Sequence, residues 1–170
     1  HDFGMYSSYI EFDDFQTQLF KPSSYLIPEK DCVSQVPWNI QDINLALNDM
    51  NEGYIRETLD NLAAYNKPTI IRFGGEMNMG DSPAAYIKAF RFVADIIHSD
   101  YPNIAVMWSP NDRGSLDRPF WFYYPGDEYV DWIGVSSFSK KDFFSSLEIE
   151  DNAEIVTSRE AQIYFTLGEF

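Results

Sequence analysis

Two glutamates stand directly after apolar segments, and each has a glycine immediately before it. Glu76 follows TIIRFGG, and Glu169 follows AQIYFTLG. Apolar runs of this length are typical of strands with both faces covered. If the two strands end at the same edge of a sheet, one carboxyl group can protonate a glycosidic oxygen while the other attacks the anomeric carbon. The alternative is that both glutamates are solvated rim residues or partners of Arg72.

The elements that must position these glutamates alternate along the chain. Apolar runs predict strands, and two longer segments repeat their apolar residues at helical spacing. In the second helix, Ser82 can serve as the cap and Pro83 occupies the first turn. The predicted strands cover residues 32–40, 69–73, 103–111, 129–138 and 161–170, and the predicted helices cover residues 51–66 and 82–102. This alternation predicts a parallel sheet with crossover helices.

Polar or aromatic residues follow the carboxyl end of each predicted strand. No G-x-G-x-x-G motif follows the first strands, so a dinucleotide-binding fold gains no support. In a barrel these strand ends converge on the face where active sites lie. We therefore predict an α/β fold of the (β/α)8 TIM-barrel type in a single domain, residues 1–170, with an open doubly wound sheet as the alternative. Such a barrel needs about 250 residues. The sequence has 170, so we expect it to be part of a longer protein.

The composition excludes several classes of partner. Lys and Arg total 12 against 27 Asp and Glu, which gives a net charge of -15. This charge disfavours nucleic acids and anionic membrane surfaces. One cysteine and two histidines exclude a disulfide framework and a cysteine- or histidine-rich metal site. No apolar run approaches the length of a membrane span, so we expect no membrane insertion. A hydrolysis that uses two carboxyl groups requires no metal or organic cofactor, so we expect neither.

Three segments carry a family resemblance: KPTIIRFGGEMN, VMWSPND and YYPGDEYVDWIGVSSF. In this order they resemble glycoside hydrolase family 26, the mannanase-like barrels, over about residues 38–170. The resemblance implies retaining hydrolysis of a neutral β-linked polysaccharide, mannan-like or another β-glycan, by a secreted or cell-surface protein. It makes Glu76 the acid/base at the end of the fourth barrel strand and Glu169 the nucleophile at the end of the seventh. The YYPGDEYVD part is predicted to be structural.

Five further residues are predicted to bind the substrate or support the glutamates: Arg72, Asn78, Trp38, Trp108 and Asn111. The resemblance directs Arg72 toward the nucleophile, where a cation favours the ionised carboxylate; a buried structural ion pair is the alternative. Asn78 is expected to order the loop after Glu76. Trp38 and Trp108 either stack on sugar rings or pack in the core. Asn111 either binds a sugar hydroxyl or shapes a turn.

Two positions depart from the resembling mannanases. Gly75 stands where they have a histidine before the acid/base, and Phe138 stands where they place a tyrosine near the nucleophile. These departures keep a second hypothesis open, a catalytically silent domain on the same barrel that binds carbohydrate or lies at the cell surface. A third is an unrelated α/β protein with both glutamates on its rim.

Overall fold

The computed structural model describes residues 5–7, 10–12, 33–40, 42–47, 49–112, 119–137 and 161–166. Their strands form one sheet in the order β1-β3-β4-β5-β6-β7, and β2 also pairs with β3. The strands are β1 (Met5–Ser7), β2 (Ile10–Phe12), β3 (Val33–Ile40), β4 (Thr69–Phe73), β5 (Ile104–Trp108), β6 (Trp132–Ser137) and β7 (Ala161–Thr166). The helices are α1 (Asp49–Ala63) and α2 (Pro83–Asp100), with 3-10 turns η1 (Ile43–Leu47), η2 (Met77–Met79), η3 (Phe120–Tyr123) and η4 (Asp127–Tyr129).

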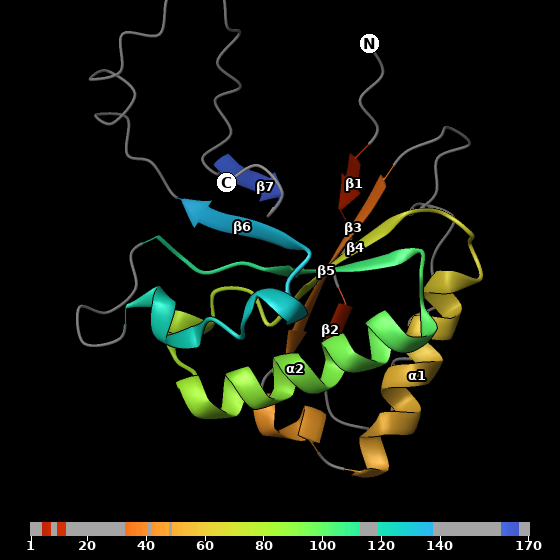
Figure 1. Ribbon diagram of the computed structural model, residues 1–170, viewed down its shortest axis with the longest axis horizontal. Helices are drawn as coiled ribbons and strands as arrows, with labels where there is room; N and C mark the ends of the chain where they lie inside the picture. The colour runs from red at the N-terminus through yellow and green to blue at the C-terminus, as the bar shows by residue number, and fades with distance from the viewer. Residues whose placement is uncertain are drawn as a thin grey trace, which may run out of the picture.

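Strands β3 to β6 form a curled parallel half-barrel, with α1 and α2 on one face of the sheet (Figure 1). Both helices lie where the apolar spacing predicts them. The residues of α2 that repeat at helical spacing are all buried: Tyr86, Phe90, Val93 and Ile97. The predicted parallel sheet with crossover helices is therefore confirmed for this part of the chain, as expected for an incomplete α/β barrel.

The last strand differs from the prediction. β7 pairs with β6 in antiparallel fashion, with Thr166 opposite Trp132 and Ala161 opposite Ser137. Its carboxyl end therefore lies beside the start of β6, away from the edge where β4 ends. A parallel neighbour needs a crossover connection, and the sequence of residues 139–160 has no amphipathic helical pattern to supply one. Glu169 itself lies outside the described residues.

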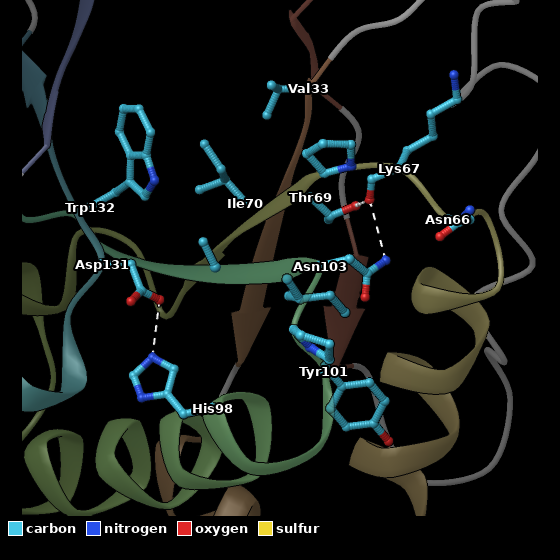
Figure 2. Close-up of a pocket in the computed structure, with 14 residues that line it drawn as sticks. Val33, Asn66, Lys67, Thr69, Ile70, His98, Tyr101, Asn103, Asp131 and Trp132 are labelled. Carbon is cyan, nitrogen blue, oxygen red and sulfur yellow. Dashed lines mark hydrogen bonds and ion pairs between the residues drawn. The ribbon is translucent and has the colours of Figure 1, made fainter.

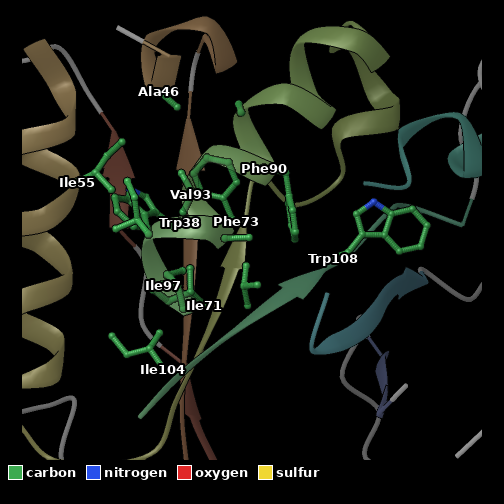
Figure 3. Close-up of a cluster of buried hydrophobic side chains, with 14 of the residues drawn as sticks. Trp38, Ala46, Ile55, Ile71, Phe73, Phe90, Val93, Ile97, Ile104 and Trp108 are labelled. Atoms are coloured by element: carbon green, nitrogen blue, oxygen red, sulfur yellow. The ribbon is translucent and has the colours of Figure 1, made fainter. Parts of the chain in front are cut away.

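The core lies between the helices and one face of the sheet (Figure 3). Successive strand residues point to opposite faces, so Ile71 and Phe73 face the helices while Arg72, between them, faces away. Phe73 makes edge-on ring contacts with Trp38 at 5.9 Å and with Phe90 of α2 at 6.1 Å. This packing fixes the position of β4, and with it the turn that carries Glu76.

The start of α2 is only partly as predicted. Pro83 is the first helical residue, as expected, and Ser82 occupies the N-cap position. The Ser82 side chain makes no capping hydrogen bond, so the predicted capping role is wrong. Its backbone carbonyl instead accepts the first helical hydrogen bond, from Tyr86, at 2.9 Å. Among the helices that the structure describes, none has the length and apolarity needed to cross a membrane.

Candidate active site

The turn after β4 holds Glu76 in an unusual backbone conformation. Gly74 has φ 54° and Glu76 has φ 63°, and both values are left-handed. This conformation costs a non-glycine residue about 1–2 kcal/mol, so the surroundings must impose it. The neighbouring strands do so, because the Gly74 N–H donates to the Trp38 carbonyl at 2.9 Å and the Glu76 N–H donates to the Ser109 carbonyl at 2.8 Å. The Glu76 side chain remains 34% exposed.

Arg72 lies buried beneath this turn and is held by two serines. Its Nε donates to Ser109 Oγ at 2.9 Å, and its Nη2 donates to Ser136 Oγ at 2.6 Å. Ser109 follows β5 and Ser136 is near the end of β6, so three parallel strands fix one guanidinium group. Nη2 also lies 3.6 Å from Glu76 Oε1. Arg72 thus pairs with Glu76, the predicted acid/base, and its contact with the predicted nucleophile stays a prediction because Glu169 lies outside the described residues.

Gly75 is explained by the position of this guanidinium group. A Cβ atom at residue 75 would lie 2.5 Å from Cζ of Arg72 and 2.7 Å from its Nε. Neither distance is sterically allowed, so a histidine at position 75 is incompatible with Arg72 in this place. The glycine therefore makes room for the Arg72 guanidinium group, in addition to removing a side chain from the site.

Asn78 and Asn111 join the loops after β4 and β5. The Asn78 side chain donates to the Asn111 carbonyl and accepts from the Asn111 N–H, each at 2.8 Å. Both residues are buried. The expectation that Asn78 orders its loop is confirmed. Asn111 also forms an isolated parallel bridge with Ser136, so its backbone links the ends of β5 and β6.

The two tryptophans do not face this site. Trp38 is fully buried and Trp108 is 5% exposed. Each shares a strand face with core residues, Val36 for Trp38 and Val106 for Trp108. The alternation of side chains along a strand therefore turns both rings toward the helix side. Both side chains therefore pack in the core, which was the alternative to stacking on sugar rings, and the predicted contact with substrate is wrong for both.

The structure thus gathers Arg72, Glu76 and two serines at the carboxyl ends of β4, β5 and β6. Ser109 and Ser136 are partners of Arg72 that were not predicted from the sequence. The sequence feature that could have indicated them is a serine at the carboxyl end of each of the two predicted strands. Glu169 and Phe138 lie outside the described residues, so the separation of the two carboxyl groups stays a prediction.

A separate cavity of about 670 Å³ lies at the opposite ends of the same strands (Figure 2). Val33, Thr69, Ile104 and Trp132, the first residues of β3 to β6, are among those lining it. His98 Nε2 lies 3.0 Å from Asp131 Oδ2, which also accepts the Val106 N–H at 2.8 Å. This pair ties α2 to the sheet at the end of a barrel where residues usually serve stability.

The YYPGDEYVD segment is anchored to α2, as its predicted structural role requires. Arg91 Nε donates to the Pro125 carbonyl at 2.7 Å, and its guanidinium carbon lies 4.9 Å from the ring centre of Tyr129. Tyr124 donates its hydroxyl to Asp127 at 2.8 Å. Burial, and then this hydrogen bond, raise the pKa of Tyr124 to about 12. The segment holds the chain between β5 and β6 against the helix.

Fold and site together define an incomplete α/β barrel with a carboxylate and a buried arginine at the carboxyl end of its sheet. Among solved structures, the chain is similar to a GH26 β-mannanase from Bacteroides ovatus, BoMan26A, with a TM-score of 0.51 and 15% identity over 68% of this chain and 44% of that one. It is also similar to GH26C from a Muricauda species, with a TM-score of 0.51 and 18% identity over 64% and 40% of the two chains.

The matched region spans less than half of the length of either structure. At these identities the likeness shows a distant GH26-like fold and carries no statement about catalytic residues. No protein-family model matches the sequence, and no curated protein matches it.

Proposed function

We propose that this chain is the part of a glycoside hydrolase that carries its acid/base residue, Glu76. The observation that carries the proposal is the conformation of Glu76. A non-glycine residue is held in a left-handed conformation at the carboxyl end of a barrel strand, with its carboxylate part-exposed beside a buried arginine. Backbone strain of this kind persists where surrounding structure imposes it, and it concentrates at active sites. The likeness to GH26 structures supports the same chemistry.

In the proposed reaction the Glu76 carboxylic acid donates its proton to the glycosidic oxygen as the bond to the anomeric carbon breaks. The attack on that carbon, which forms a covalent glycosyl-enzyme intermediate, is assigned to the Glu169 carboxylate. This role requires that the residues after β7 reach the edge where β4 ends, because Thr166 pairs with Trp132 at the start of β6. Glu76 then removes a proton from water, which releases the sugar with retained configuration. Arg72 supplies a fixed positive charge beside the Glu76 carboxyl group. The proposed substrate is a neutral β-linked polysaccharide, mannan-like or another β-glycan, outside the cell.

Glu76→Gln and Glu169→Gln test this proposal in the full-length protein. Each is expected to reduce hydrolysis of β-mannan, or of another neutral β-glycan that the protein cleaves, by at least about 10²-fold. Glu57→Gln is the matched control, because Glu57 is exposed on α1, and it is expected to retain full activity. Hydrolysis that survives either of the first two substitutions contradicts the assigned roles.

The second candidate is a silent carbohydrate-binding domain on the same fold. Gly75 favours it, since the histidine of the resembling mannanases is absent and Arg72 fills its space. This candidate predicts that the full-length protein binds neutral β-glycans without releasing reducing ends. Measurable turnover on any of them, lost on Glu76→Gln, excludes it.

A further inference from the structure

A patch of exposed apolar side chains lies on the turns that follow β4 and β5. We call it the Trp121 patch, and it comprises Met79, Phe120, Trp121 and Phe122, which are 63%, 40%, 61% and 53% exposed. These are the large apolar side chains that the described part of the chain leaves exposed. Isolated apolar residues on a surface are ordinary, but a contiguous aromatic group marks an interaction site.

The rings of the Trp121 patch are held in fixed relation to one another. Phe120 rests on the buried Trp108, with ring centres 6.2 Å apart. Trp121 contacts Phe120 at 5.2 Å and Phe122 at 6.4 Å, each nearly at right angles. Edge-to-face contacts of this kind are the geometry that aromatic pairs prefer. The exposed indole therefore has a ring contact with each of its two neighbours along the chain.

The patch lies next to the candidate active site. Met79 belongs to η2, the turn directly after Glu76, and η2 contacts η3, which carries Trp121. Figure 1 shows the yellow-green η2 turn beside the teal η3 turn. The Tyr123 hydroxyl donates to the Asp81 carbonyl at 2.9 Å, which fastens η3 to the chain between η2 and α2. A long substrate bound at Glu76 can continue onto these rings.

The charge around the patch selects its ligand. Asp127 and Glu128, five and six residues after Phe122 in the next turn, are exposed, and the sequence carries a net charge of -15. An anionic ligand would be repelled here, and two copies of the patch would bring like charges together. A neutral sugar chain needs no counter-charge, and the apolar C–H faces of its rings gain dispersion contacts on an aromatic surface.

We propose that the Trp121 patch is a binding platform for a neutral polysaccharide chain, beside the cleavage point and separate from it. The platform would hold sugar units through ring stacking on Trp121, with Phe120 and Phe122 supporting the indole. This inference deepens the proposed function and rests on it for the class of ligand.

Affinity gel electrophoresis of the full-length protein tests the platform. The Glu76→Gln background keeps the polymer intact during the measurement, and β-mannan and a neutral β-glucan are the two probes. In this background Trp121→Ala is expected to lower the affinity for the bound polymer about tenfold. Trp132→Ala is the matched control, since Trp132 lies at the opposite end of the sheet, and it is expected to bind like its parent. Thermal unfolding confirms that each variant is folded.

The outcomes separate the two proposals. If binding depends on Trp121 but the protein with Glu76 intact does not hydrolyse the polymer, the binding-platform proposal is supported and the proposed enzymatic activity is contradicted. If hydrolysis depends on Glu76 but the Trp121→Ala variant binds the polymer as well as its parent does, the enzymatic proposal is supported and the binding-platform proposal is overturned. Absence of binding to both polymers also overturns it. Sedimentation that reveals a dimer abolished by Trp121→Ala overturns it as well, because the patch would then be an interface between copies.

Discussion

Asn78 and Asn111 are joined by two hydrogen bonds that run in opposite directions, each 2.8 Å long. The Asn78 amide nitrogen donates to the Asn111 carbonyl, and its amide oxygen accepts from the Asn111 N–H. The two residues are 1% and 5% exposed, so water has little access to replace either bond. One side chain thus locks the loop after β4 to the loop after β5, two residues from Glu76.

The substitution Asn78→Ala is expected to lower the free energy of unfolding by about 2–4 kcal/mol, because it removes two buried hydrogen bonds to the backbone of Asn111. Urea unfolding measures the change. Asn44→Ala is the control: Asn44 is exposed and its side chain donates to Asp42 at 2.9 Å, so its loss is expected to cost at most about 0.5 kcal/mol. Equal effects of the two substitutions would contradict a locking role for Asn78.

Gly75→Ala is expected to destabilise the fold by about 1–3 kcal/mol, as overpacking does in a dense interior. The added Cβ would lie 2.5 Å from Cζ of Arg72, and the guanidinium would have to leave its two serines. Gly53→Ala is the matched control, since nothing lies within 4 Å of a Cβ at that position in α1. Alanine there is expected to stabilise the helix by about 0.5–1 kcal/mol.

A double-mutant cycle identifies the source of the Gly75 effect. In an Arg72→Ala background the added Cβ has no guanidinium group to clash with. The loss of unfolding free energy caused by Gly75→Ala is therefore expected to fall below about 0.5 kcal/mol, which corresponds to a coupling free energy of about 1 kcal/mol or more. Chemical unfolding of the four proteins gives the coupling directly. An unchanged cost in the Arg72→Ala background would assign the effect to the backbone of the turn instead.

Glu76→Gly is expected to stabilise the protein by about 0.5–1 kcal/mol. Glycine adopts the left-handed conformation without the cost of about 1–2 kcal/mol. Part of this gain is lost because glycine also increases the conformational freedom of the unfolded chain. Glu76→Gln is the control, because glutamine carries the same backbone cost and is expected to leave stability within about 0.5 kcal/mol. A glycine variant less stable than the glutamine variant would show that the turn stores no strain.

Asp81→Asn is expected to stabilise the protein at neutral pH. Burial, with a smaller contribution from Asp42, raises the pKa of Asp81 above its ordinary value of 3.8. The folded state therefore favours the protonated carboxyl, and this stabilisation is present below pH 3.8 and lost as the pH rises through the raised pKa. Because the side chain is partly exposed, the gain at pH 7 is expected to be about 0.5 kcal/mol or less.

Thermal unfolding from pH 3 to pH 8 measures this pH dependence. The difference between Asp81→Asn and the parent is expected to shrink as the pH falls and to vanish below about 3.8. Asp95→Asn on the exposed side of α2 is the control for the substitution itself. A difference for Asp81→Asn that is the same at every pH would exclude ionisation as its cause.

Much of the fold could be predicted because its signals are local. The spacing of Tyr86, Phe90, Val93 and Ile97 gives the helix and its buried face, and the apolar run 69–73 gives the strand that ends beside Glu76. Polar residues at successive strand ends also predict that those ends meet. Each signal depends on the period of the element that contains it, which a single sequence records.

Three features were decided only by the tertiary structure. A side chain near a strand end belongs to one face or the other according to register, so the sequence alone left Trp38 and Trp108 between a sugar platform and the core. The direction of β7 depends on its pairing with β6, and its apolar run would be the same in either direction. The need for glycine at position 75 arises from Arg72, whose guanidinium is placed by Ser109 and Ser136 on two other strands. Contacts between residues distant in sequence set all three, whereas the sequence by itself determined which residues could form strands, helices and an acidic site.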